Sequence, residues 1–373
     1  MIAPNIRVLD KNFNLLATLD SYTSFQGERS LWEVGTCELH IGLRNQGANK
    51  LQAGVLISID PHRVWEINNI KLTEDKDLKL VASGKELKTI LKQRLIVPDK
   101  KNDTQHFGFD RFPNPEDPDA TAETIMKYYV NKHAVNPDDP KRKLPRLNIA
   151  VDRQRGLKTR WSERFKSIVD CFKDIGEFAG IGYEVYLDHK NKEFIFDVIP
   201  ERIQTIGSDN PVVFSRDYNN IANLNYTLDT SEDVTVAYAG GYGTDEDRLI
   251  QLVARNEEDM NLSGYNRKES WIDVASSQTV DDLIYEAQHQ LSKKEKKETL
   301  SSNAIPNVSF EYLKNWDIGS IVTVESRRLG FMQNKKITAV KEVYERNKVE
   351  ITPTFGKRNL NILDEIRKTE VIR

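Results

Sequence analysis

The stretch WDIGSIVTVE (residues 316–325) resembles LQAGVLISID (residues 51–60), which lies near the other end of the chain. In both, a glycine, Gly319 or Gly54, leads into an alternating strand pattern that ends in an acid. Both stretches then continue to an aromatic residue, an isoleucine-rich strand and a closing strand that runs into Gly-Lys. The likeness indicates two related β-domains near the two ends of the chain, and chance similarity between strands is the alternative.

The region around the first stretch, residues 1–95, has the pattern of a β-domain. IRVLDKNFNLLATLD (6–20) alternates around a turn, and WEINNIKLTEDKDLKLVASG (65–84) is typical of a hairpin with a polar turn. KELKTILKQR (85–94) keeps helical spacing and predicts a short helix after the hairpin.

Residues 96–204 predict a small α+β domain that follows a loop rich in Pro, Asp and Asn. TAETIMKYYVNKHAV (121–135) predicts a first helix, and a second helix is expected with Ser162 as its N-cap and Gly180 near its end. A hairpin is expected over residues 183–199. The second helix carries one apolar stripe, formed by Phe165, Ile168, Val169, Phe172, Ile175 and Phe178.

The remainder of the chain returns to strands. Residues 205–300 form a strand-rich segment that ends in a charged helix (281–298), and residues 301–356 predict a second β-segment that packs with parts of 205–300. Residues 357–373 form a C-terminal tail. The expected class is therefore α+β, mostly β, with several domains.

Composition excludes several classes of function. The net charge of −3 and the pI near 6.2 are not the footprint of a protein that binds nucleic acid or an anionic membrane. The only cysteines, Cys37 and Cys171, are too few for a thiolate zinc site and are expected to be free thiols, although one bridge between them stays open. The chain lacks a signal-peptide pattern and an apolar run of about 20 residues, so we expect a soluble protein without a membrane anchor.

The stretch AYAGGYGTDEDR (237–248) is the strongest candidate for a ligand site, because glycines follow a strand pattern as in phosphate-binding loops. The P-loop lysine is missing, and the dinucleotide fingerprint has Glu246 in place of its third glycine. The carboxylates at 245–247 would repel a phosphate. A turn after a strand is therefore favoured over a loose calcium site, and the element that begins near Arg248 is either a strand or a helix.

No other motif predicts catalysis. The histidines show no H-E-x-x-H spacing, there is no G-x-S-x-G motif, and Cys37 and Cys171 are expected to be core residues. We therefore predict no catalytic, cofactor-binding or metal-binding residues, and a role in binding or assembly rather than an enzyme. The histidines are His40, His62, His106, His133, His189 and His289.

Several segments, taken in order over residues 5–356, resemble the tail hub proteins of siphophages, which are related to the N-terminal part of tail-associated lysins. They include VLDKNFNLLATLDSY (8–22), LWEVGTCELHI (31–41), NPDDPKRKLPRL (136–147), FAGIGYEV (178–185) and the closing strands from 317 to 356. Cys37 replaces a Phe that is usual in the family, and Val234 replaces an Asn before the glycine stretch.

The resemblance implies a structural protein of a phage tail tip or baseplate, made in the host cytoplasm, with a Gram-positive, lactococcal-like host. It implies that residues 1–95 and 301–356 are β-barrel-like tube domains and that three subunits present six copies to a sixfold ring. The implied partners are two further subunits, the hexameric distal tail protein, the end of the tape-measure protein and receptor-binding proteins. The hub would close or extend the tail tube for DNA passage, without specific nucleic-acid binding and without a cofactor.

Two alternative functions are an adhesin that binds host saccharides and a cell-wall hydrolase of the tail tip. The tail of residues 357–373 is too short for a further domain, so we expect a hub without lytic activity.

Overall fold

The computed structural model describes residues 3–74, 78–99, 107–113, 120–305, 310–328, 330–346 and 348–356. The chain divides into two compact units. Unit 1 is Met1–Leu224 with Ser301–Gly356, and the described part of unit 2 is Asn225–Leu300. Strands outnumber helices, so the expected α+β class, mostly β, is confirmed. No helix among the described residues is long and apolar enough to cross a membrane, and the predicted C-terminal tail lies outside those residues.

The N-terminal half-sheet, residues 6–86 of unit 1, has the strand order β3-β4-β7-β6-β5-β1-β2, with every neighbouring pair antiparallel. The hairpins predicted at 6–20 and 65–84 are confirmed. The predicted helix that follows is the 3-10 helix η2 (Leu87–Gln93). The strands are β1 (Ile6–Leu9), β2 (Leu15–Leu19), β3 (Ser24–Ser30), β4 (Thr36–Gly42), β5 (Leu56–Ser58), β6 (Val64–Glu74) and β7 (Leu78–Glu86).

The C-terminal half-sheet has the order β17-β21-β24-β23-β22, and β15 and β16 both pair with β22 in parallel. Its closing strands coincide with those predicted from the sequence. The strands are β15 (Arg202–Gln204), β16 (Val213–Ser215), β17 (Ile221–Asp229), β21 (Lys297–Ala304), β22 (Ser320–Ser326), β23 (Phe331–Glu345) and β24 (Lys348–Gly356).

The two half-sheets contain a structural repeat. β5-β6-β7 and β22-β23-β24 are both antiparallel meanders in which a short strand precedes a long one. The Gly54 N–H donates to the Ile67 carbonyl at 2.7 Å, and the Gly319 N–H donates to the Ile337 carbonyl at 2.8 Å. Directly after each of these isoleucines the register shifts by one residue, which marks a β-bulge in β6 and in β23. The sequence likeness between 51–60 and 316–325 thus coincides with a shared backbone design.

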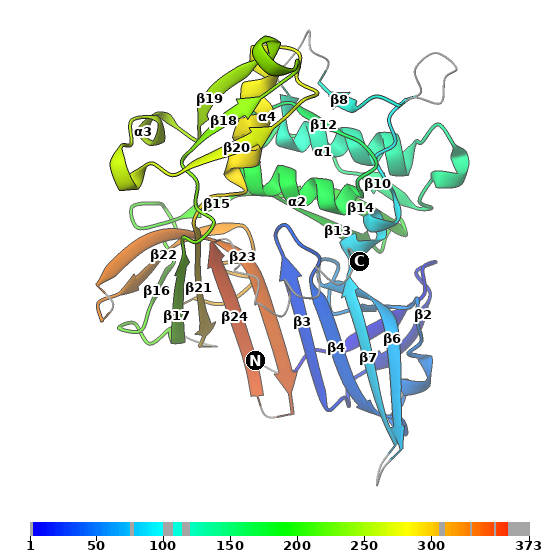
Figure 1. The fold of residues 1–373 in the computed structure, drawn as a ribbon. Coiled ribbons are helices and arrows are strands. Elements are labelled where there is room, and N and C mark those ends of the chain that lie inside the picture. Colours follow the sequence, from blue (N-terminus) through cyan, green and yellow to red (C-terminus); the bar gives the residue numbers. More distant parts are fainter. Residues whose placement is uncertain are drawn as a thin grey trace. The chain divides into compact units, whose positions relative to one another are not determined.

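β23 joins the half-sheets into one 14-stranded sheet. Its first part (331–336) pairs with β22, and its second part (339–345) pairs on the same side with β3 at residues 24–30. Figure 1 shows β23 and β24 running beside β3, although they come from opposite ends of the chain. Backbone hydrogen bonds therefore hold the two ends of the sequence together.

The predicted α+β region lies between the half-sheets in sequence and belongs to unit 1. α1 (Ala122–Val130) and α2 (Ile168–Ala179) share a core with β13 (Gly182–Asp188) and β14 (Glu193–Ile199), and β10 (Leu147–Ile149) pairs with β14 in parallel. The predicted hairpin at 183–199 is β13 and β14, whose registered pairs run from Gly182–Ile199 to Asp188–Glu193.

The predicted start of the second helix is wrong. α2 begins at Ile168, after Ser167, whose hydroxyl accepts the Asp170 N–H. Ser162 lies instead in β12, which pairs with β8, and Phe165 has a φ of 52° and is 49% exposed. Both serines satisfy the preference for an N-cap, and the long-range pairing of β12 selects the later one.

Unit 2 begins within β17 and ends within β21, and most of it lies between these two strands in the sequence. Its three-stranded sheet has the order β19-β18-β20, formed by β18 (Val236–Gly240), β19 (Ile250–Ala254) and β20 (Glu269–Asp273). α4 (Val280–Ser292) packs Leu283, Ala287 and Leu291 into the core of this unit, so the predicted charged helix is present. Its predicted end at residue 298 is wrong, because α4 ends at Ser292 and residues 297–298 already belong to β21.

The remaining elements are short. The strands are β8 (Asp110–Phe112), β9 (Ala120–Thr121), β11 (Lys158–Thr159) and β12 (Trp161–Glu163), and the fourth α-helix is α3 (Glu257–Met260). The single-turn helices are η1 (Ala48–Lys50), η3 (Asn131–Val135), η4 (Pro140–Arg142), η5 (Asp245–Asp247) and η6 (Gly264–Asn266).

The paired glycines of the repeat give a matched test. Gly54 has a φ of 92° and open space where a Cβ would stand, whereas Gly319 has a φ of 85° and a Cβ there would lie 3.0 Å from Ile199. We expect Gly54→Ala to lower the free energy of unfolding by about 1 kcal/mol through backbone strain, and Gly319→Ala to lower it by about 1 kcal/mol more. Urea unfolding measures both, and equal losses would contradict this account of the second glycine.

Candidate functional site at the joint between the half-sheets

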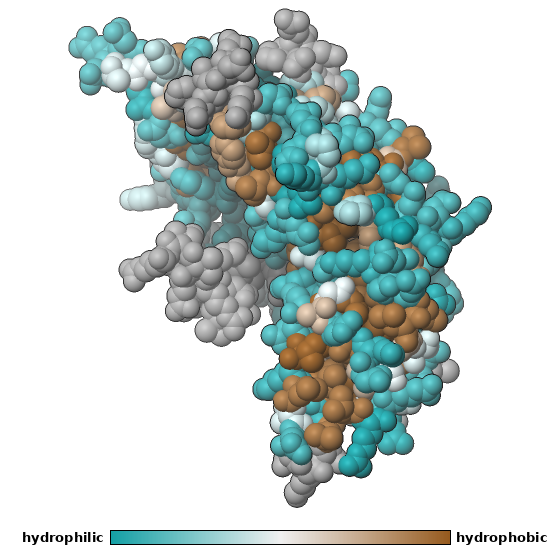
Figure 2. Space-filling model, turned by 90° about the vertical axis from the view of Figure 1, so that its right-hand side faces the viewer, coloured by the Kyte–Doolittle hydropathy of each residue, from teal (hydrophilic) through white to brown (hydrophobic). Residues whose placement is uncertain are grey.

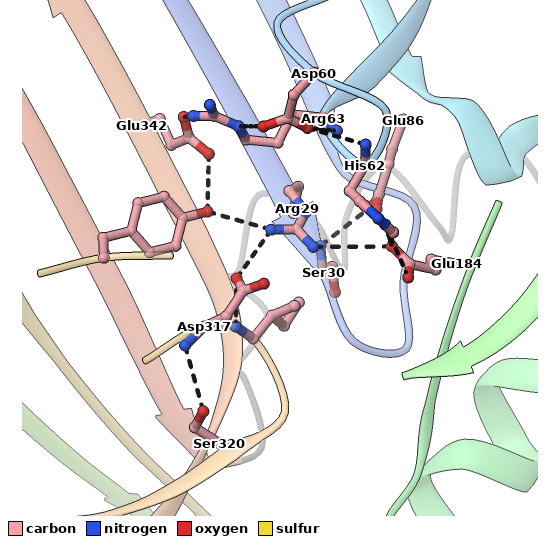
Figure 3. Close-up of polar contacts among 12 residues, drawn as sticks. Arg29, Ser30, Asp60, His62, Arg63, Glu86, Glu184, Asp317, Ser320 and Glu342 are labelled. Carbon is pink, nitrogen blue, oxygen red and sulfur yellow. Dashed lines mark hydrogen bonds and ion pairs between the residues drawn. The ribbon is translucent and has the colours of Figure 1, made fainter. Parts of the chain in front are cut away.

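A cluster of polar side chains, several of them buried, lies where β3 meets β23, within unit 1 (Figure 3). Its members come from three places in the sequence: the N-terminal half-sheet, the hairpin β13–β14 and the C-terminal half-sheet. They are Arg29, Asp60, His62, Arg63, Glu86, Lys88, Glu184, Tyr312, Asp317, Glu342 and Tyr344.

Arg29, on β3, connects the three places. Its side chain is 4% exposed, its Nη1 donates to Asp317 at 2.9 Å and to the Tyr312 hydroxyl at 3.4 Å, and its Nη2 lies 3.9 Å from Glu184. Burial lowers the pKa of Arg29, but Tyr312, Asp317 and Glu184 outweigh burial and hold it well above its ordinary value. Arg29 is therefore a permanent buried cation whose charge is matched by acids from two other parts of the fold.

Glu342, on β23, is the buried anion on the other side of the joint. Its side chain is fully buried, and one oxygen accepts from Arg63 at 2.8 Å and from the Tyr344 hydroxyl at 2.7 Å. The other oxygen accepts from the Tyr312 hydroxyl at 2.8 Å. Arg63 also donates to Asp60 at 2.7 Å. These bonds satisfy the carboxylate, which would otherwise be costly to bury.

Two further contacts extend the cluster to the α+β region. His62 lies 3.1 Å from the carboxylate of Glu184 on β13, and the hydrogen bond between them raises the pKa of His62 although burial opposes it. Glu86 accepts the Gly35 N–H at 3.0 Å and lies 3.5 Å from Lys88, which is fully buried. Lys88 Nζ in turn donates to the Tyr183 carbonyl on β13 at 3.3 Å.

The cluster is suited to fixing a joint rather than to chemistry. Its acids accept hydrogen bonds from named side chains or backbone groups, and its arginines are paired with carboxylates. Across the described residues, no three His, Cys, Asp or Glu side chains form a group that could hold a metal ion. Buried ion pairs of this kind contribute little net stability but penalise every arrangement that leaves a charge unpaired.

Sequence reasoning missed this cluster, because it predicted no site residues. One local signal was present: in β23 the alternation places Glu342 on the same face as the buried Val340 and Tyr344. A charged residue at an inward position is unusual unless it is paired. Its partners, however, come from distant parts of the sequence.

The glycine stretch 237–248 is a turn between two strands, as predicted. β18 and β19 pair in antiparallel register from Val236–Ala254 to Gly240–Ile250, so the element after Arg248 is a strand and not a helix. Arg248 lies over the Trp271 ring at 5.2 Å, and Gly240 is backed so closely by that ring that a Cβ would stand 2.4 Å from it. The glycines serve packing and the turn.

The cysteines are placed in the core. Cys37 and Cys171 are buried free thiols, and burial raises the pKa of Cys37 to about 12 and that of Cys171 well above its ordinary value. Both thiols therefore stay protonated at neutral pH and are unsuited to act as nucleophiles.

The histidines of the chain are spread over the fold, and His106 lies outside the described residues. His133 and Asp110, both buried, are 2.6 Å apart, and Lys132 also donates to Asp110 at 3.1 Å. Burial raises the pKa of Asp110, but these two hydrogen bonds outweigh burial and lower it. The Tyr129 hydroxyl donates to the Asp110 carbonyl at 2.9 Å, so the group pins β8 to α1.

One protein family matches the sequence over nearly its whole length. The sequence model of the family described as Siphovirus ReqiPepy6 Gp37-like protein matches residues 5–357. No curated protein matches the chain.

Three solved structures share the fold over nearly their whole length. The tail protein from Neisseria meningitidis MC58 is 11% identical, with a TM-score of 0.57 and coverage of 95% of this chain and 96% of that chain. The 43 kDa tail protein of prophage MuSo2 from Shewanella oneidensis is 12% identical, with a TM-score of 0.58 and coverage of 95% and 98%. Prophage tail protein gp18 from Listeria monocytogenes EGD-e is 12% identical, with a TM-score of 0.55 and coverage of 99% of each chain. At these identities the likeness shows the fold alone.

Removal of the Arg29 charge tests the role of the cluster. We expect Arg29→Met to lower the free energy of unfolding by about 3–5 kcal/mol, because Asp317 would lose its nearest cation, and Glu184 would lose a second cation, at positions that are at most 21% exposed. The matched control is Arg327→Met, since Arg327 is 72% exposed and its ion pairs are expected to contribute less than about 1 kcal/mol. Equal losses in denaturant unfolding would contradict a special role for Arg29.

Glu123, on α1, predicts a dependence of stability on acid. Its side chain is fully buried, and the Arg155 and Lys127 hydrogen bonds outweigh burial and lower its pKa from 4.5 to about 2. Because the pKa of Glu123 is lower in the folded chain than in the unfolded chain, its carboxylate stabilises the fold by about 3 kcal/mol above pH 4.5. This stabilisation is lost as the pH falls from 4.5 toward 2 and the carboxylate becomes protonated. Glu123→Gln should be less stable than the wild type at pH 7 and should approach it near pH 2. A constant difference across this range, measured by denaturant unfolding, would contradict the assignment.

Proposed function

The chain belongs to the Siphovirus ReqiPepy6 Gp37-like protein family, and we propose that it is the trimeric hub of a phage tail tip. In this proposal the hub docks on the ring of the hexameric distal tail protein and closes or extends the tail tube through which DNA passes into the host. Its place is the tail tip or baseplate of the virion, and its host is a Gram-positive bacterium.

The structural repeat is the observation that carries this proposal. A chain with two related half-sheets presents the same kind of surface twice, so three copies present it six times. The six similar surfaces of a threefold assembly can then contact the six subunits of a sixfold ring, one surface to each subunit. In the proposed hub, residues 1–95 and 301–356, the latter with parts of 205–300, are the two tube-forming domains, and residues 96–204 form the α+β domain.

The joint between the half-sheets supports a mechanical role. The two domains of one copy must keep a fixed register if they are to present equivalent faces to a ring. The β3–β23 ladder and the ion cluster around Arg29 and Glu342 provide that register. Three solved structures with the same fold are described as tail proteins, which supports the tail as the place of assembly.

The other proposed partners follow from a position at the end of a tube. The end of the tape-measure protein would lie inside the ring, and receptor-binding proteins would attach outside it. A chain with a net charge of −3 suits a conduit that DNA must pass without adhesion to the wall.

Mass measurement tests the hub proposal. We expect a particle of three chains, either for the purified protein or after addition of the hexameric distal tail protein encoded by the same phage. The measurement is light scattering coupled to size exclusion, over a range of protein concentrations. A strict monomer under both conditions contradicts the proposal. Clearing of host cell walls by the purified chain would contradict the separate expectation that the hub has no lytic activity.

A further inference from the structure

β6 and β23, the equivalent long strands of the structural repeat, differ in the strands that pair along one of their edges. β23 uses the same edge twice, first for β22 and then, after its bulge, for β3. β6 uses the equivalent edge once, for β5 at residues 64–66. Beyond the bulge of β6, residues 69–74 have β7 on one side and, within the described parts of the chain, no strand on the other.

The backbone groups of this open edge can be identified. The Leu43 N–H donates to the Leu78 carbonyl, so alternate residues of β7, Leu80 and Ala82 among them, direct their backbone groups toward β4. Leu72 and Ile70 lie opposite Leu80 and Ala82. Their N–H and C=O groups therefore point away from β7, toward the open edge.

The side chains at equivalent positions of β6 and β23 also differ in burial. In β23, Val340, Glu342 and Tyr344 are all buried at the joint with β3. Counting from the bulge, Ile70 and Leu72 of β6 stand in the places of Val340 and Glu342. Leu72 is nevertheless 62% exposed.

Figure 2 shows apolar surface in the lower part of the view, the level at which Figure 1 places the N-terminal half-sheet with β6 and β7. An exposed apolar side chain beside an open strand edge is a liability that proteins avoid unless the edge is covered.

The structure also contains a strand equivalent to β3, and this strand could pair with the open edge of β6. β3, which covers β23, is the neighbour of β4, and the corresponding neighbour of β21 in the C-terminal half-sheet is β17. β17 ends the described strand order, and its Leu228 is 49% exposed. The described part of the chain thus carries, at residues 69–74, an edge without the cover that its counterpart in β23 has, and it carries in β17 a strand equivalent to that cover.

We propose that residues 69–74 of β6 pair in antiparallel register with β17 of a second copy of this chain, as β23 pairs with β3 within one copy. This inference rests on the proposed trimeric hub and names the surfaces that hold it together. Each copy supplies both of these edges, so the contact is head to tail, and in the proposed trimer the third copy returns to the first. In a ring of three copies, joints within a chain would alternate with joints between chains.

A proline at Leu72 tests the contact. Leu72→Pro removes the N–H that faces the open edge and leaves the hydrogen bonds between β6 and β7 in place, since Leu72 does not direct its N–H toward β7. The matched control is Leu15→Pro: Leu15 is 59% exposed, is the first residue of β2, and lies at the opposite end of the strand order from β17. We expect wild type and Leu15→Pro to form trimers and Leu72→Pro to need at least about tenfold higher concentration to do so.

Hydrogen exchange gives a second measurement that needs no variant. In the assembled wild type, the Ile70 and Leu72 amides should exchange at least about tenfold more slowly than in dilute monomer. Fast exchange of both amides in the trimer overturns the inference even where Leu72→Pro fails to fold. A trimer that Leu72→Pro leaves unchanged also overturns it, while the proposed hub stands. A wild type that never forms trimers, with or without the distal tail protein, overturns the proposed hub itself.

Discussion

Seven registered residue pairs between β3 and the second part of β23 unite the beginning and the end of this chain. The relative placement of the half-sheets depends on that ladder, because it is the only described pairing of strands that connects the N-terminal half-sheet with the C-terminal half-sheet. A shift of one residue would turn the inward side chains of β23 outward and would separate Arg29 and Glu342 from their partners. The backbone ladder and the ion cluster therefore specify the same register by two independent means.

The polar cluster explains how this register is selected over its neighbours. A slip of two residues keeps the apolar face of a strand turned inward, so apolar packing alone separates such a slip only weakly from the native register. Buried charges separate the two strongly, since each one that loses its partner costs several kcal/mol. Arg29, Arg63 and Glu342 thus contribute specificity more than net stability, and a role in which two domains must keep one geometry is consistent with that choice.

Much of this fold could be predicted from the sequence, because the strands of both half-sheets alternate apolar and polar residues and are bounded by turns. The hairpins, the two central helices, the glycine-stretch turn and the repeat itself were all predicted from local patterns. The error at Ser162 has a definite cause: two serines had equal local preference for the N-cap, and the pairing of β12 with β8 decided between them.

The ion cluster was not predictable, because its members come from separate parts of the chain and meet only when β3 pairs with β23. The insertion of unit 2 was likewise not predictable from the sequence. The loop between β3 and β4 has only residues 31–35, whereas the corresponding strands β17 and β21 are separated by a folded module, and no composition shift marks that difference.

The position of that insertion has an evolutionary consequence. The chain leaves the sheet at β17 and returns at β21, two strands that are neighbours in the sheet, so both ends of the module lie close together. A module with adjacent ends can be lengthened, shortened or exchanged without altering the ladder that holds the half-sheets. A lineage of such proteins can therefore diversify at this point while its framework is inherited unchanged.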